Sequence, residues 1–193
     1  MKTVFKTGLY AALTCAAFMH PAFAQTAAEP TVKAAPAATS LADRGWEMVW
    51  SDEFNGNKID GSKWNYDTDC WGGGNEERQC YTDKKKNANV KDGVLSITAL
   101  RKRTTGHALP LRQRKTRKLA KKSATKPYSS ARLQTMGKGD WRYGRIEVRA
   151  KLPGGQGVWP AIWMLPSDEH YGGWAASGEI DIMEAVNLGV PCE

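Results

Sequence analysis

Hydrophobic and polar residues alternate along this chain in short runs that have the length of β-strands. The runs are WEMVW (46–50), VLSITAL (94–100), YGRIEVRAKL (143–152), VWPAIWML (158–165) and GEIDIMEAV (178–186). Turn-forming pairs such as Asn55-Gly56 and Asp92-Gly93 lie between them. Only the segment 101–126 shows a weak helical period. The pattern predicts an all-β fold, either a β-sandwich or a jelly roll.

The run at 143–152 illustrates the alternation. One face carries Tyr143, Arg145, Glu147 and Arg149, and the other carries Ile146, Val148 and Ala150. Successive side chains of a strand point to opposite faces, so we expect one side to pack on a core and the other to meet solvent or a polar ligand.

The first 43 residues differ from the rest. Residues 1–24 combine two lysines, an apolar run at 9–18 and the small-x-small ending Ala22-Phe23-Ala24, which predicts a secretory signal peptide cleaved after Ala24. The apolar run is too short to span a bilayer. Cys15 offers a lipoprotein anchor as the rival interpretation, without a convincing lipid-attachment pattern before it. Residues 25–43 are rich in Ala, Pro and Thr and predict a flexible linker.

The positive charge of the chain is local. The net charge is +8, with 28 Lys plus Arg against 20 Asp plus Glu, and eleven of the basic residues lie between Arg101 and Lys126, where no acidic residue occurs. Without that segment and the signal peptide, acidic residues outnumber basic ones. We interpret 101–126 as a solvated insertion joining two strands, or as a patch that attracts an anionic polymer or envelope phosphate. Nucleic acid is not expected, because no aromatic residue interleaves the charges.

Export to an oxidising compartment favours disulfides. Cys70 and Cys80 flank the loop Gly72-Gly73-Gly74 and are predicted to close it, with two free buried thiols as the alternative. Cys192 has no evident partner in the sequence.

Histidine is scarce, which argues against a Ser-His-Asp hydrolase or a His-rich zinc site. Carboxylates are better placed. Strand alternation directs Glu179 and Asp181 to one face, and an extra residue, a β-bulge near Met183, would return Glu184 to that face. On a helix, Glu179 and Glu184 would point about 140° apart. Two convergent carboxylates suit retaining glycoside hydrolysis, whereas an exposed acidic strand or a calcium ligand set is the alternative.

Three motifs, in order along the chain, resemble those of a known family. The segments SDEFNG (51–56), YGRIEVRAKLPGGQGVWPAIWMLP (143–166) and GEIDIME (178–184) resemble those of glycoside hydrolase family 16, most closely its laminarinase branch. The resemblance covers the chain from about residue 46 onward. It implies a jelly-roll β-sandwich of the concanavalin A type whose concave sheet forms a glycan cleft.

The resemblance also implies roles for individual residues. Glu179 matches the nucleophile, Glu184 the general acid/base and Asp181 the assisting carboxylate. The positions that match substrate-binding residues are Asn75, Arg149, Trp159, Trp163 and Trp174, of which Trp163 could equally pack in the core. Glu53 and the carbonyl of Gly93 are candidates for a structural calcium ion, while the chemistry itself requires no metal.

The implied function is that of a secreted, monomeric endo-glycosidase acting on β-1,3 or mixed-linkage glucan. A non-catalytic, lectin-like glucan-binding protein is the alternative. Glucan linkage, and agar or carrageenan as alternative substrates, stay open at this point. Because the sequence ends nine residues after Glu184, we expect residues 44–193 to be a partial catalytic domain, an incomplete jelly roll of doubtful activity alone.

Overall fold

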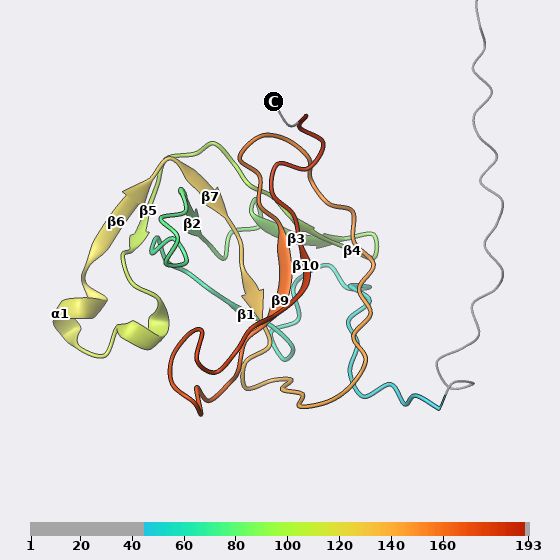
Figure 1. Ribbon diagram of the computed structural model, residues 1–193. Coiled ribbons are helices and arrows are strands. Elements are labelled where there is room, and N and C mark those ends of the chain that lie inside the picture. The colour runs from blue at the N-terminus through green and yellow to red at the C-terminus, as the bar shows by residue number, and fades with distance from the viewer. Residues whose placement is uncertain (1–44, 192–193) are drawn as a thin grey trace, which may run out of the picture. The chain divides into compact units, whose positions relative to one another are not determined.

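The computed structural model describes residues 45–191 of the 193-residue chain, and these are almost entirely β-structure and loops (Figure 1). The predicted signal peptide (1–24), the linker up to residue 43 and Cys192 lie outside the described residues. The strands are β1 (Asn65–Tyr66), β2 (Gln79–Tyr81), β3 (Ala88–Lys91), β4 (Val94–Ile97), β5 (Thr104–His107), β6 (Ser123–Lys126), β7 (Tyr128–Ser130), β8 (Leu133–Gln134), β9 (Ala161–Met164) and β10 (Ile180–Glu184). The helices are η2 (Leu111–Gln113) and α1 (Arg117–Ala120), and neither has the length and hydropathy needed to cross a membrane.

The described strands pair in five two-stranded ladders. The pairs β1–β8, β3–β4, β5–β6 and β9–β10 are antiparallel, and β2–β7 is parallel. Two of these ladders join segments that are far apart in the sequence, because β1 pairs with β8 and β2 pairs with β7. These ladders form the all-β structure that the sequence predicts.

The hairpin β3–β4 turns at Asp92-Gly93, where the sequence predicts a turn. Asp92 and Gly93 have φ values of 51° and 74°. Two consecutive left-handed residues form the type I′ turn, whose twist matches that of the flanking strands. Gly93 tolerates this backbone without steric cost, and Asp is one of the few other residues that accept it.

The run at 143–152, predicted as a strand, joins no ladder in the described structure, and neither does 46–50. Its alternation is nevertheless preserved. The even-numbered residues Ile146, Val148, Ala150 and Leu152 line a cavity of about 340 Å³ together with Ile162, Ile182 and Met183. On the opposite face Arg145 and Glu147 form an ion pair of 2.6 Å. The alternation of side chains therefore predicts which face of 143–152 lies toward β9 and β10. It does not predict backbone pairing, which requires a neighbouring strand.

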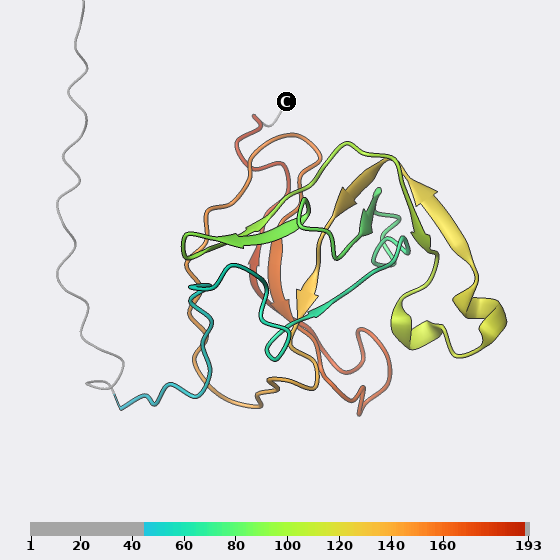
Figure 2. The ribbon, with the colours of Figure 1, turned by 180° about the vertical axis from the view of Figure 1, so that it is seen from behind.

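The basic segment 101–126 is more ordered than the predicted loop. It forms the hairpin β5–β6, with η2 and α1 at its far end, and it does join two strands, β4 and β7. The hairpin projects from the strands around it (Figure 1 and Figure 2). Its base packs on the disulfide-closed loop: the carbonyl of His107 accepts a 2.7 Å hydrogen bond from the Cys70 amide.

Small and polar residues make up the buried interior around this loop. The apolar residues with the lowest exposure are Cys70, Cys80, Ala88, Val90 and Ala131. Asn87, 2% exposed, connects three segments: its Oδ1 accepts from Thr82, and its Nδ2 donates to the Thr98 carbonyl and to Ser129. Buried amides of this kind require such partners, because an unpaired polar group is costly in the interior.

Candidate active site

The pairing of β9 with β10 determines where the acids point. Asp181 lies opposite Trp163, Met183 opposite Ile162, and Glu184 opposite Ala161. Ile182 has no partner on β9, so it is the extra residue of a β-bulge. The sequence predicts this bulge near Met183 with Met183 as the extra residue, and that detail is wrong by one position.

The bulge aligns two carboxylates. Trp163 and Ala161 share one face of β9, because they are two residues apart, and their partners Asp181 and Glu184 therefore share that face too. Ile180 and Met183 pair with the alternate residues of β9 and point to the opposite face, where Met183 lines the apolar cavity. If the same residues formed a regular strand without a bulge, Glu184 would point to the cavity side.

Two tryptophan indoles hold the outer acids. Trp159 Nε1 donates a 2.7 Å hydrogen bond to Glu184 Oε1, and Trp174 Nε1 donates to Glu179 Oε2. An indole N–H can only donate, so each bond fixes an oxygen lone pair of a carboxylate. Both tryptophans are largely exposed, at 49% and 70%. Their rings can therefore meet a ligand that lies over the acids.

Asn75 and Arg149, matched to substrate-binding positions, are more peripheral. Asn75 lies in the glycine-rich loop between Cys70 and Cys80, where its backbone N–H donates to the Gly72 carbonyl at 3.0 Å. Arg149 is exposed on the polar face of the segment 143–152. Within residues 45–191, no hydrogen bond or ion pair joins either side chain to Glu179, Asp181 or Glu184.

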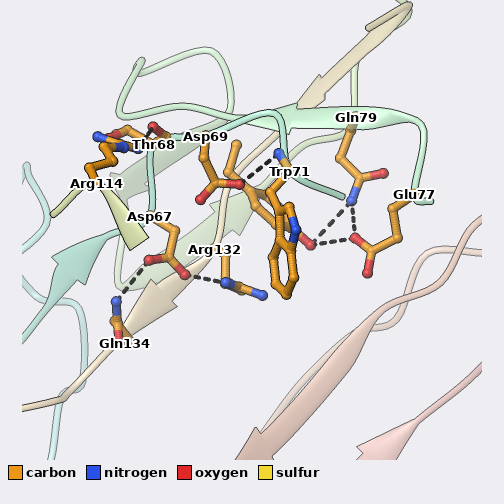
Figure 3. Close-up of polar contacts among 10 residues, drawn as sticks. Asp67, Thr68, Asp69, Trp71, Glu77, Gln79, Arg114, Arg132 and Gln134 are labelled. Atoms are coloured by element: carbon orange, nitrogen blue, oxygen red, sulfur yellow. Dashed lines mark hydrogen bonds and ion pairs between the residues drawn. The ribbon is translucent and has the colours of Figure 1, made fainter. Parts of the chain in front are cut away.

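Arg132, which the sequence did not single out, lies next to the acid-bearing face. Its guanidinium carbon is 5.8 Å from the ring centroid of Trp163 and 4.9 Å from that of Tyr81. Figure 3 shows its ion pair with Asp67, whose other oxygen accepts a 2.8 Å bond from Gln134. Burial alone would lower the pKa of Arg132, but the Asp67 carboxylate raises it. The arginine therefore stays charged between two aromatic rings.

Tyr81 connects this network to Glu77 and Gln79. Its hydroxyl donates to Glu77 Oε2 at 2.8 Å and accepts from Gln79 Nε2 at 3.1 Å. Burial, followed by the nearby Glu77 carboxylate, raises the pKa of Tyr81 well above its usual value. The hydroxyl thus stays protonated and keeps its bond to Glu77.

Little in the sequence signals this network. Arg132 and Gln134 belong to YSSARLQT, whose polar residues are typical of a solvated strand. Their importance follows from the pairing of β1 with β8 and β2 with β7, which brings residues 65–81 beside 128–134. Contacts of such long sequence separation leave no local pattern.

The two residues proposed to hold calcium lie in neighbouring loops. Asn55 Oδ1 stands 3.8 Å from the position that a Cβ of Gly93 would take, which links the loop of Glu53 to the β3–β4 turn. Among residues 45–191, no three His, Cys, Asp or Glu side chains gather in a metal-binding group.

Cys70 and Cys80 form a disulfide in the structure. The bond closes the loop of Asn75 and lies beneath the β5–β6 hairpin. Gly106 makes this packing feasible, because a Cβ at its position would be only 3.1 Å from the Cys70 sulfur.

Comparison with known proteins connects this arrangement to a family. Residues 99–191 match the family model described as "XgeA-like, catalytic GH16 domain". The chain is 45% identical over 155 residues to glucan endo-1,3-beta-glucosidase A1 of Niallia circulans, an alignment that covers 76% of this chain and 21% of that protein. It is 35% identical over 162 residues to a beta-1,3-glucan-binding protein of Penaeus monodon, covering 72% of this chain and 43% of that protein.

The fold is that of laminarinase structures, so the predicted jelly-roll sandwich is confirmed for the part of it that this chain contains. The laminarinase from Rhodothermus marinus superposes with a TM-score of 0.60 at 46% identity, covering 74% of this chain and 51% of that one. The chain thus spans between about a fifth and a half of the length of these three proteins.

Proposed function

Because this chain belongs to glycoside hydrolase family 16, we propose that Glu184, at the end of β10, and Glu179, just before β10, hydrolyse internal bonds of a β-1,3-linked or mixed-linkage glucan with retention of configuration. The observation that carries the proposal is the bulge at Ile182, which turns Asp181 and Glu184 to the face of Trp163. Retaining enzymes need two carboxyl groups about 5–5.5 Å apart on one face. The similarity to a glucan endo-1,3-beta-glucosidase and to a laminarinase supports β-glucan as the substrate.

In the first step, the Glu179 carboxylate attacks the anomeric carbon of a glucosyl unit. Glu184 donates its proton to the glycosidic oxygen as the bond from that oxygen to the anomeric carbon breaks. The product sugar leaves, and the remaining glycosyl unit is held as an ester of Glu179. The indole of Trp174 keeps Glu179 oriented for this attack.

In the second step, Glu184 acts as a base. A water molecule gives a proton to the Glu184 carboxylate, and its oxygen attacks the anomeric carbon. The ester bond breaks and Glu179 is free again. The indole of Trp159 binds Oε1 of Glu184, which leaves Oε2 to carry the proton in both steps. Asp181, on the same face, assists the pair electrostatically.

The surroundings fit a sugar polymer. The exposed rings of Trp159 and Trp174 offer flat faces for the apolar faces of pyranose rings. Trp163 shares the face of Asp181, and Arg132 packs against its ring. Asn75 and Arg149 supply donors for sugar hydroxyls at the edges of the site.

A glucan-binding protein without turnover is the second candidate. It is supported by the similarity to the Penaeus monodon protein, which is named for binding β-1,3-glucan. The two functions differ in one requirement, since binding needs the aromatic rings alone whereas hydrolysis needs both outer glutamates.

The test uses the full 193-residue chain with laminarin. We expect release of reducing ends, and NMR of the first product should show the β-anomer. Glu179→Gln and Glu184→Gln should each lower kcat by about a thousandfold or more, because each removes a group of the reacting pair. Glu47→Gln, a change at an exposed acid outside β10, is the matched control.

One outcome would decide against hydrolysis, and another against Glu179 as the nucleophile. If the chain binds laminarin but releases no reducing ends, the glucan-binding function holds. If hydrolysis occurs and survives Glu179→Gln, the nucleophile is another residue.

Secretion and a bound calcium ion are part of the proposal. The sequence of residues 1–24 supports export, which mass spectrometry of the mature N-terminus would establish as starting at Gln25. Isothermal titration with calcium, compared between the chain and Glu53→Gln, tests the metal.

A further inference from the structure

The far end of the β5–β6 hairpin concentrates positive charge without a counter-charge. Five exposed basic residues lie within eight positions, and we call them the tip patch: Lys115, Arg117, Lys118, Lys121 and Lys122. Thr116 caps α1 within this patch, accepting a 3.2 Å bond from the Leu119 amide. The patch is thus part of an ordered turn of helix.

The other basic residues from the start of β5 to the end of β6 (104–126) are engaged in the fold, whereas Arg101, Lys102 and Arg103 are exposed and precede β5. Arg114 donates to the carbonyls of Leu109 and Thr68, and Lys126 donates to that of Glu77. Arg112 pairs with Glu169 at 3.2 Å. Within the chain from 45 to 191, this is the one ion pair that the hairpin makes. The tip patch therefore repels itself, and an anionic ligand would relieve that repulsion.

The hairpin is held in a fixed position against the loops around the acids. Its base contacts the disulfide-closed loop that carries Asn75, through the Cys70 amide and Lys126. Near its far end, Arg112 reaches Glu169, in the loop that leads to Trp174. That loop lies beside the hairpin in both views of the ribbon (Figure 1 and Figure 2). A polymer that extends past Trp174 would thus approach the tip patch.

We propose that the tip patch is a second binding surface, for a polysaccharide that carries sulfate or carboxylate groups. The hairpin contacts the loops of Asn75 and Trp174, which belong to the proposed glycan cleft, and in this respect the inference rests on the proposed function. A long polymer could reach the cleft and the tip patch at once. The outward face of the hairpin adds hydroxyls suited to sugars, since Thr105 and Thr125 are exposed and hydrogen-bonded to each other at 2.7 Å.

Two other polyanions fit the hairpin less well. The bases of a single-stranded nucleic acid stack on aromatic side chains of the protein that binds it. Residues 101–126 contain no Phe, Tyr or Trp. Membrane docking gains strength from an inserted apolar face, whereas Leu119 and Ala120 of α1 are half-buried and only Leu111 is a large exposed hydrophobic residue.

The test measures binding of the full chain to dextran sulfate, a sulfated glucan without β-linkages. It does not depend on hydrolysis, so its outcome is separate from that of the proposed function. We expect binding at low salt that weakens strongly at 0.5 M NaCl, and no binding to uncharged dextran. Changing all five residues of the tip patch to Gln should weaken binding at least about tenfold, since each exposed charge contact contributes modestly.

The matched control removes five positive charges elsewhere. It changes Lys58, Lys84, Lys85, Lys86 and Lys91 to Gln, all of which are exposed. The control variant should keep its affinity for dextran sulfate within about twofold. Both variants should keep the circular dichroism of the original chain, because every changed side chain is on the surface.

Three results would overturn the proposal. The first is no binding of dextran sulfate by the original chain, and the second is an equal loss in the two variants, which would mean attraction by net charge alone. The third is tighter binding of single-stranded DNA or of vesicles containing 30% phosphatidylglycerol than of dextran sulfate, measured at the same salt concentration.

Discussion

The indole of Trp159 donates a 2.7 Å hydrogen bond to Glu184, so a residue two positions before β9 orients the acid that ends β10. The bond connects a ring exposed enough to contact sugar with the group proposed to transfer the proton. Substrate binding and orientation of the acid thus depend on the same side chain.

Replacing this indole by a ring without a donor separates its two roles. Trp159→Phe keeps an apolar ring but removes the hydrogen bond to Glu184. We expect kcat for laminarin to fall about tenfold or more, because a bond to a carboxylate is worth about 1.5–3 kcal/mol, while KM changes less. Steady-state kinetics measure the split, with the exposed Trp46→Phe as control. A change in KM alone would mean that Trp159 only binds sugar.

The contact between Gly106 and the Cys70 sulfur predicts a steric effect on stability. In Gly106→Ala the new methyl group would stand 3.1 Å from that sulfur, which is tighter than ordinary packing. We expect a loss of about 1–3 kcal/mol and a lower Tm in a thermal melt. Gly61→Ala, where no atom lies within 4 Å of the new carbon, is the control and should melt near the original temperature. Equal Tm values for the two variants would show that the hairpin shifts freely.

Asn87 predicts a larger effect, because its amide serves three partners. Asn87→Ala leaves Thr82, Ser129 and the Thr98 carbonyl short of a partner in a buried place. We expect the free energy of unfolding to fall by about 2–3 kcal/mol, read from urea denaturation. Asn57→Ala, at an exposed position, should change it by less than about 0.5 kcal/mol. A small effect at Asn87 would mean that water replaces the amide.

The raised pKa of Tyr81 predicts how stability depends on alkaline pH. Above about pH 10 the unfolded chain loses the tyrosine proton, whereas the folded chain retains it. The unfolded state then binds fewer protons, so this tyrosine makes stability decline with rising pH, by about 1.4 kcal/mol per pH unit at most. Below pH 10 it has no such effect.

Urea midpoints at pH 9 and pH 10.5 measure this decline. Tyr81→Phe, which cannot ionise, should show a smaller loss between the two values than the original chain. Tyr143→Phe, at a residue 85% exposed, should behave like the original. If all three chains lose stability equally, other groups such as lysines account for the whole effect.

How far the sequence predicts this molecule depends on the range of the contacts involved. The turn at Asp92-Gly93, the two faces of 143–152 and the bulge after Asp181 are local, and the sequence indicates each of them, the last to within one residue. Alternation does not reveal whether a run finds a hydrogen-bonding neighbour. The pattern of 143–152 therefore predicts a paired strand, whereas this segment joins no ladder in the described structure.

The long-range contacts could not be predicted. Arg132 between Tyr81 and Trp163, and Asn87 between Thr98 and Ser129, depend on how separate strands pack together. In the sequence, each of these is one polar residue in a polar stretch. The charge of 101–126 is evident in the sequence, but its hairpin is not, because Thr104–His107 and Ser123–Lys126 lack the apolar alternation of a half-buried strand.

The bulge at Ile182 also determines which single-codon deletions in β10 would keep its acids on one face. If the codon for Ile182 were lost, Glu179, Asp181 and the former Glu184 would stand at every second position of an unbulged strand, all still on one side. Losing the codon for Ile180 would instead move Glu179 to the side opposite Asp181. Ile180 and Ile182 are the same amino acid two positions apart in β10, yet they differ sharply in their tolerance of a single-codon deletion.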